Sequence, residues 1–166
     1  MAKSPKTLDD LFLDSLKDVY FAEKKILVAL PKMAKAAQNS ELKAAFEKHK
    51  GETQGQVERL EQVFQLLDKK PQGKTCPAIL GIIEEGTEIM EEYKGSPALD
   101  AGLLGAAQAV EHYEITRYGS LRAWATELGM KDAAALLQQT LDEESATDQA
   151  LTQLATSVVN MQAEAA

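Results

Sequence analysis

Apolar residues recur every three or four positions along most of the chain, the spacing that gathers them on one face of an α-helix. The residues between them are mainly Ala, Glu, Lys and Gln, which favour helices. The pattern is interrupted by residues typical of helix starts and ends, at Asn39-Ser40, Pro71-Gln72-Gly73, Ser96-Pro97 and Gly129. It predicts five helices, over about residues 7–36, 40–69, 77–93, 97–128 and 130–159. Thr7, followed by two acids, can cap the first of them.

The lengths of the connections predict how these helices are arranged. Short turns near Gln38 and Gly129 make two antiparallel hairpins. The connection between them, from about residue 70 to 96, is long enough to run the length of a bundle, and it contains the short helix over 77–93. The predicted fold class is therefore all-α, with residues 1–166 as a single domain. It is a ferritin-like four-helix bundle of two antiparallel hairpins, joined by a long crossover that contains a short extra helix.

Polar residues interrupt each of the four apolar faces at matching heights. Glu23 and Glu52 lie 15 and 14 residues from the first turn, and Glu114 and Glu144 each lie 15 residues from the second. At about 1.5 Å per residue, all four lie roughly 22 Å from their turns. Two hairpins packed side by side can bring both pairs together. The polar residues on the four faces are Glu23; His49, Glu52 and Gln56; Glu111 and Glu114; and Glu144 and Asp148.

A cluster of carboxylates inside a helical bundle indicates a bound cation, because ionised carboxylates in a dry core must be paired, protonated or bound to metal. No matching stripe of Lys or Arg accompanies them. Oxygen ligands with one imidazole favour iron or manganese over a thiolate-type zinc site. Each Glu alone has an alternative at the edge of its face, reaching solvent, and His49 has one as a hydrogen-bonded core residue. His112 follows Glu111 directly, so it points about 100° away and is not expected to be a ligand.

The charge and the cysteine content narrow the possible partners and the compartment. The formal net charge of −8 disfavours nucleic acid as a partner. No apolar run approaches the roughly 20 residues that span a bilayer, and no secretory signal follows the basic N-terminus, so we expect a cytoplasmic protein without a membrane partner. A single cysteine, Cys76, fits a reducing compartment. We expect it to be a small buried apolar residue rather than a nucleophile.

Four segments carry a resemblance to a known family. They are Leu11–Tyr20 with Glu23 following, Glu52-Thr53-Gln54, Val110–Ile115 and Leu141–Glu144. With these segments the chain resembles the YciE/YciF-type family of bacterial ferritin-like proteins over nearly its whole length. The resemblance implies a dimerising, stress-associated bacterial protein with no firmly assigned reaction.

The wider ferritin-like superfamily supplies one Glu from each of two helices and a Glu-x-x-His from each of the other two. This chain departs from that pattern, because neither histidine follows a Glu by three residues and Thr147 stands where the last His would be. Its Glu111-x-x-Glu114 is similar to the rubrerythrin arrangement. By that match the first-choice metal ligands are Glu23, Glu52, Glu111, Glu114 and Glu144, and the second choices are His49, Gln56 and Asp148. The missing histidines bear on redox potential and oxygen chemistry more than on metal binding.

Two functions remain open at this point. The first is a protein that binds two metal ions, iron first with manganese or zinc as alternatives, and acts as an oxidase or handles peroxide, with oxygen or peroxide as the small oxidant. Tyr20 and Tyr113 are candidates for the wall of such a site, with core packing as the alternative that we favour. The second is a non-catalytic structural or interaction protein of the stress response. In either case we expect a homodimer rather than a hollow cage, from the resemblance and from the absence of an obvious fifth C-terminal bundle helix.

Overall fold

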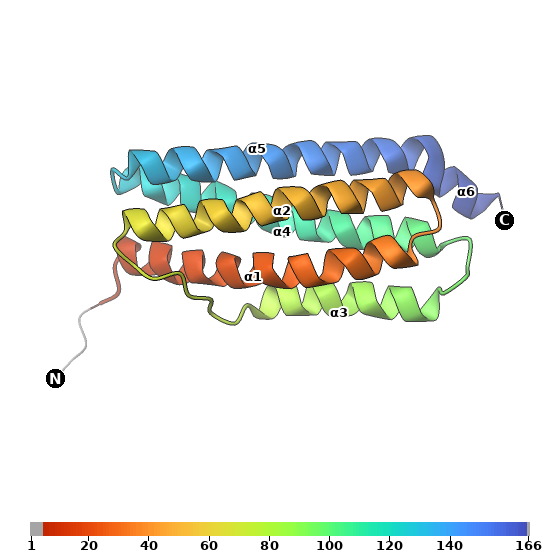
Figure 1. Cartoon of the computed structure of the whole chain (residues 1–166), viewed down its shortest axis with the longest axis horizontal. Helices are drawn as coiled ribbons and strands as arrows, with labels where there is room; N and C mark the ends of the chain where they lie inside the picture. The colour runs from red at the N-terminus through yellow and green to blue at the C-terminus, as the bar shows by residue number, and fades with distance from the viewer. Residues whose placement is uncertain (1–4, 166) are drawn as a thin grey trace.

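Long helices make up most of the computed structural model, which describes residues 5–165 and contains no strand within them. Helix α1 (Leu8–Ala36) pairs with α2 (Ser40–Leu66), and α4 (Leu99–Glu127) pairs with α5 (Lys131–Leu154). The two pairs pack together through α1 on α4 and α2 on α5. Figure 1 shows the four helices lying side by side along the long axis of the molecule. The result is an all-helical bundle.

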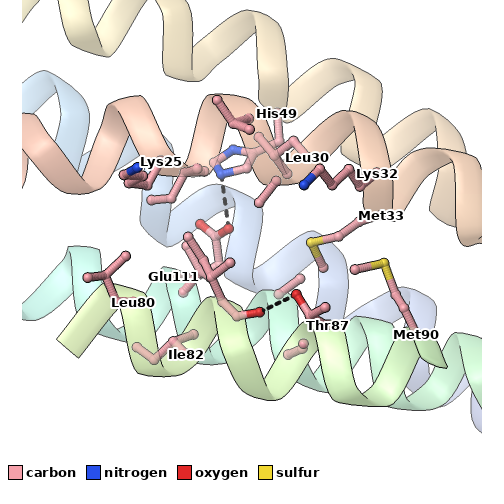
Figure 2. Close-up of a pocket in the computed structure, with 18 residues that line it drawn as sticks. Lys25, Leu30, Lys32, Met33, His49, Leu80, Ile82, Thr87, Met90 and Glu111 are labelled. Carbon is pink, nitrogen blue, oxygen red and sulfur yellow. Dashed lines mark hydrogen bonds and ion pairs between the residues drawn. The ribbon is translucent and has the colours of Figure 1, made fainter. Parts of the chain in front are cut away.

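The long connection after α2 runs back along the outside of the bundle. It leads to α3 (Pro77–Glu92), which packs against α1 and α4. Because of this return, α2 and α4 run in the same direction (Figure 1). Helix α3 approaches α4 closely at Gly102, where an added Cβ would lie 2.7 Å from Cγ2 of Ile89. A cavity remains between α1, α3 and α4 (Figure 2).

The capping residues expected for the first two helices are confirmed. The Thr7 hydroxyl accepts a hydrogen bond from the Asp10 amide, and the Asp10 carboxylate accepts one from the Thr7 amide in return. The Asn39 side chain accepts from the first two amides that follow Ser40. Helix α4 begins at Leu99, two residues later than predicted, because Ser96–Ala98 form a turn in which the Ser96 hydroxyl accepts from the Ala98 amide.

The C-terminal helix changes its hydrogen-bond pattern near its end. The sequence predicts a regular helix over 130–159, but α5 ends at Leu154. One π-helical turn follows over Ala155–Val159, and a short helix α6 covers Asn160–Glu164. Such a turn accommodates an additional residue without ending the helix. Ala155 and Val159 remain buried in the core, so the turn does not expose the apolar face.

A carboxylate of α4 fixes the turn between α1 and α2. Asp100 is buried, and its two oxygens accept hydrogen bonds from the backbone amides of Gln38 and Asn39, at 2.8 and 2.6 Å. A buried backbone amide without a partner is costly, and for these two amides the acceptor comes from outside the first hairpin. The second hairpin therefore completes the turn of the first.

Two apolar clusters fill the bundle, and every long bundle helix contributes to both. In α1 the change from one cluster to the other occurs around Tyr20–Ala22, and in α4 between Val110 and Tyr118. Apart from Asp100, the buried polar residues lie at this same level: Glu23, His49, Thr53, Gln56, Glu111, Glu114, Thr140 and Glu144. A polar layer therefore crosses the middle of an otherwise apolar core. None of the helices within residues 5–165 combines the length and the apolar character needed to cross a membrane.

Candidate metal centre

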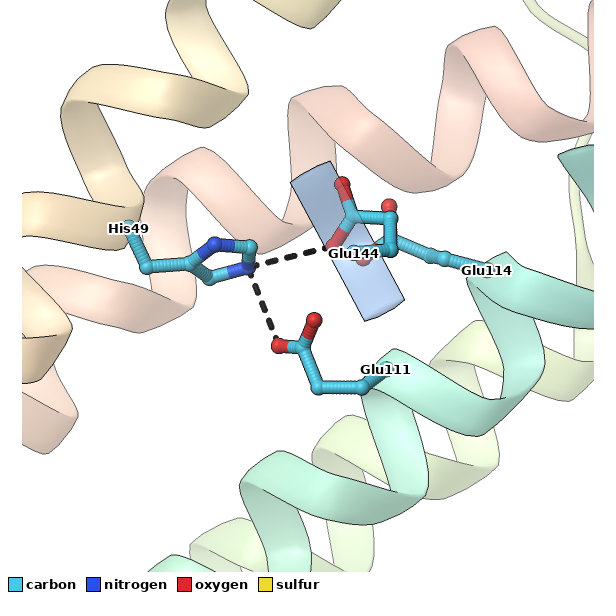
Figure 3. A group of neighbouring side chains, drawn as sticks. All are labelled: His49, Glu111, Glu114 and Glu144. Carbon is cyan, nitrogen blue, oxygen red and sulfur yellow. Dashed lines mark ion pairs between the residues drawn. The ribbon is translucent and has the colours of Figure 1, made fainter. Parts of the chain in front are cut away.

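Four side chains from three helices converge in the polar layer. His49 comes from α2, Glu111 and Glu114 from α4, and Glu144 from α5. Each offers one ligand atom, and these four atoms lie within 4.8 Å of one another. Figure 3 shows the imidazole of His49 facing the carboxylates of Glu111 and Glu144. Their exposed fractions are 4%, 1%, 0% and 0%, in chain order, so the group is shielded from solvent. We call these four residues the core cluster.

The helical spacing explains how α4 supplies two of these groups. Residues three apart lie on the same face of a helix, so Glu111 and Glu114 both turn inward. The His49 Nε2 atom lies 3.1 Å from a Glu111 oxygen and 4.0 Å from a Glu144 oxygen. His49, which belongs to the first hairpin, therefore lies next to two carboxylates of the second hairpin.

The carboxylates of the core cluster are not satisfied by the protein. Buried oxygens without a hydrogen-bond partner occur on all three glutamates, one on Glu111 and both on Glu114 and on Glu144. Within residues 5–165 no lysine or arginine forms an ion pair with any of these three. Buried charges are normally paired or bound to metal. Carboxylates with one imidazole are suitable donors for hard or intermediate divalent cations such as iron or manganese, so the residues present fit such an ion.

Burial and mutual repulsion make these carboxyl groups hard to ionise. Burial is the largest cause in each case, and neighbouring carboxylates add to it for Glu23, Glu111 and Glu114. The pKa of Glu23 is raised to about 8 and that of Glu111 to about 11. The pKa values of Glu114 and Glu144 are also raised. In the metal-free protein Glu23 and Glu111 hold protons at neutral pH that a bound cation would displace.

Glu23 of α1 joins the polar layer beside the core cluster and is bonded to a tyrosine. Tyr118 is fully buried, and its hydroxyl donates a hydrogen bond to Oε1 of Glu23. Neither of the tyrosines considered from the sequence lies there. The hydroxyl of Tyr20 donates to Glu61, and that of Tyr113 donates to Asp18. Tyr118 was identifiable in principle, because it follows Glu114 by four residues and shares its helical face.

Gln56 belongs to a second polar group at the side of the core cluster. Gln56 is fully buried, and its amide nitrogen donates to Glu143 at 3.2 Å. Arg59 donates to both oxygens of Glu143, at 3.0 and 2.8 Å, and to the Thr140 hydroxyl. Neither Arg59 nor Glu143 was predicted from the sequence. Arg59 pairs with Glu143 and not with the carboxylates of the core cluster. Those carboxylates therefore gain no ion pair from it.

Two further candidate ligands lie outside the core cluster. The Glu52 side chain is 27% exposed and pairs with Lys48, while its other oxygen lies 3.8 Å from Nδ1 of His49. The neighbouring His49 imidazole and the pairing with Lys48 lower its pKa to about 2. Asp148 accepts a hydrogen bond from Gln108 and pairs at 3.1 Å with His112, whose side chain is 68% exposed. Glu52 therefore lies at the edge of the polar layer beside His49, and Asp148 pairs with His112 near the protein surface.

Comparison with known proteins places the chain among relatives of nearly equal length. It is 46% identical to Protein YciF of Escherichia coli (strain K12) over 160 residues, which are 96% of this chain and 96% of that protein. The crystal structure of the E. coli stress protein YciF matches with a TM-score of 0.89 and 46% identity, covering 94% of this chain and 99% of that one. YcfI of Rhodopseudomonas palustris, described as a putative structural protein, matches with a TM-score of 0.86 and 46% identity, over 92% of this chain and 97% of that one.

The same fold occurs at greater distance. A protein of Xanthomonas campestris pv. campestris has a TM-score of 0.71 at 23% identity, over 92% of this chain and 94% of that one. The family described as a domain of unknown function, DUF892, matches residues 7–164. The resemblance to YciF-type proteins expected from the sequence motifs is therefore confirmed, and the chain belongs to the DUF892 family.

Proposed function

We propose that this chain is a ferritin-like protein that binds two metal ions in its polar layer and acts in the cytoplasm in a redox or stress-related role. The observation that carries the proposal is the core cluster, in which buried carboxylates from two helices face a histidine from a third and have unpartnered oxygens. Paired antiparallel hairpins with a long return between them support the ferritin-like assignment. The E. coli relative is described as a stress protein, which supports the stress-related role.

Some residues of the polar layer would bind metal, and others would position those ligands. Glu111, Glu114, Glu144 and His49 would hold the first ion, and Glu23 extends the carboxylate set from α1 toward a second. Glu52 is close enough to His49 to join after a change of rotamer. Iron, with manganese or zinc as alternatives, would supply Lewis acidity and, for the first two, a redox couple toward oxygen or peroxide. Tyr118 orients Glu23, and the apolar clusters flank the layer on both sides.

Metal content and metal position test this proposal directly. Protein purified without added metal and then loaded with iron(II) or manganese(II) should contain two ions per chain. Anomalous diffraction should place them about 3.5–4 Å apart, as in two-metal sites generally. Elemental analysis before loading identifies the native metal. A loaded crystal in which Glu23, Glu111 and Glu144 contact no ion would overturn the proposal.

We also propose that the chain forms a homodimer. The sequence resemblance to a dimerising family supports it, and exposed apolar side chains such as Leu11 and Leu66 offer surface for contact. Light scattering of the full chain should give twice the mass of one chain. A large hollow shell, as cage-forming proteins have, would contradict the proposal.

A structural role is the second candidate, and one observation favours it. A relative with 46% identity is described as a putative structural protein. In that case metal would only stabilise the bundle. Steady consumption of peroxide or iron(II) by the loaded chain would support the redox role, whereas tight metal binding without turnover would leave the structural one.

A further inference from the structure

A cavity of about 260 Å³ lies between α1, α3 and α4. Figure 2 shows the side chains of α1 and α3 facing each other across it. Its walls are mainly apolar, with Ile26, Leu30, Met33, Ile83 and Met90 among the larger side chains. Pockets for small molecules are typically concave and apolar with a few placed polar groups. We call this space the α1–α3 cavity.

The two ends of the α1–α3 cavity differ in character. The inner end is formed by His49 and Glu111, which are 4% and 1% exposed and belong to the core cluster. The outer end includes Val28 and Leu80, which are 60% and 38% exposed and are therefore open to water. A ligand entering from outside would thus have its leading end directed toward His49.

The charges around the α1–α3 cavity favour a ligand whose outer end is anionic. Lys25 and Lys32, both exposed on α1, line it, and among residues 5–165 Glu111 at the inner end is its only acidic lining residue. The glutamates of α3, such as Glu84 and Glu88, line a different hollow. An anionic group placed inside would meet Glu111 and the carboxylates beyond it, whereas at the outer end it would meet the two lysines.

We propose that the α1–α3 cavity binds a medium-chain aliphatic carboxylate, with its chain inside and its carboxylate between Lys25 and Lys32. An apolar cavity of about 150 Å³ accommodates benzene, so the larger volume here suits a chain of about eight to ten carbons. The terminal methyl group then lies nearest His49. This binding needs no metal ion, and it goes beyond the proposed function of the core cluster.

Calorimetric titration of the metal-free full chain with decanoate, below its micelle concentration, tests the proposal. We expect one saturable site per chain. Octanoate should bind about fifteenfold more weakly, because it buries two fewer methylene groups and each contributes about fourfold. Decylamine should bind more weakly than decanoate. Absence of saturable decanoate binding, as when a second copy covers the opening, or tighter binding of decylamine, would overturn it.

Two sets of variants separate the charged end from the apolar chain. Lys25→Gln with Lys32→Gln should weaken decanoate binding about threefold to tenfold and leave decanol, which has no charge, unchanged. The control is Lys35→Gln with Lys43→Gln, because these lysines line a separate hollow. Equal weakening by both pairs would show that only the overall charge matters and would contradict the proposed position of the carboxylate.

Filling the cavity tests the position of the chain. Ala29 and Ala107 line it from α1 and α4. Ala29→Leu and Ala107→Leu should each weaken the binding of both decanoate and decanol by tenfold or more. The reason is that the larger side chain displaces several methylene groups of the ligand from the cavity. Circular dichroism melts confirm that each variant is folded. Unchanged binding in a folded Ala29→Leu chain would overturn the proposal. The double variant Glu114→Gln, Glu144→Gln should lose metal and still bind decanoate, so the two proposals fail independently.

Discussion

Adding manganese(II) or iron(II) to the metal-free protein at neutral pH should raise its melting temperature by roughly 10 °C. A ligand that binds only the folded state at about a thousand times its dissociation constant adds about 4 kcal/mol to the free energy of unfolding. For a chain of this length each kcal/mol corresponds to about 2–4 °C. The unfolded chain does not hold His49, Glu111 and Glu144 together, so the effect depends on the folded core cluster. Scanning calorimetry with and without metal measures it.

The same melts should depend on pH in a defined direction. Glu23 has a pKa of about 8 in the folded protein against an ordinary value of 4.5, so the folded state binds more protons between these values. The free energy of unfolding of the metal-free protein should therefore fall as pH rises from about 4.5 to about 8, as far as this layer dominates. Metal, which replaces the protons, should reverse the trend. A melting temperature that metal leaves unchanged at pH 7 would show that the layer is not a metal site.

Replacing Glu23 by Gln should stabilise the metal-free protein while weakening metal binding. The glutamine side chain has no proton to take up, and it keeps an oxygen that can accept from Tyr118. At pH 7 the wild-type carboxyl is still protonated, although the ordinary pKa of this group is 4.5. At about 1.4 kcal/mol per pH unit over this interval, the substitution should add roughly 3 kcal/mol to the free energy of unfolding, and little below pH ~4.5. Urea denaturation at both pH values measures this.

A second tyrosine–glutamate pair provides the control. Tyr20 donates to Glu61 at 2.8 Å on the partly exposed side of the bundle, away from the core cluster. Glu61→Gln should change neither the pH dependence nor the metal affinity, because this carboxylate lies outside the crowded polar layer. If Glu23→Gln and Glu61→Gln behave alike, the polar layer does not have the electrostatic character described above.

Sequence periodicity was sufficient for the level of the polar layer but not for the orientation of each side chain in it. Counting residues from the turns placed Glu23, Glu114 and Glu144 at one height, because helices have a constant rise. His49 and Glu52 are three residues apart, and a small rotation of α2 about its axis decides which of them faces the centre. In the structure His49 does, and Glu52 pairs with Lys48 at the rim.

The periodicity of the sequence did not predict features that depend on contacts between several helices. Asp148 follows Glu144 by one helical turn and shares its face, but Gln108 and His112 of α4 draw it toward the surface. The pairing of Arg59 with Glu143 links α2 and α5 and has no signature within either helix. The α1–α3 cavity arises from how α3 lies on the bundle, which neither its length nor its apolar face determines.

The bond between Asp100 and the turn at Gln38 and Asn39 has a consequence for how the chain folds. The two amides belong to the first hairpin and their acceptor to the second, with separations of 62 and 61 residues along the chain. The first hairpin alone would leave its turn open to fraying, so its closing and its docking become a single cooperative event. Cooperative assembly of this kind disfavours half-formed states, in which the carboxylates of the polar layer would be exposed to adventitious cations before their partners arrive.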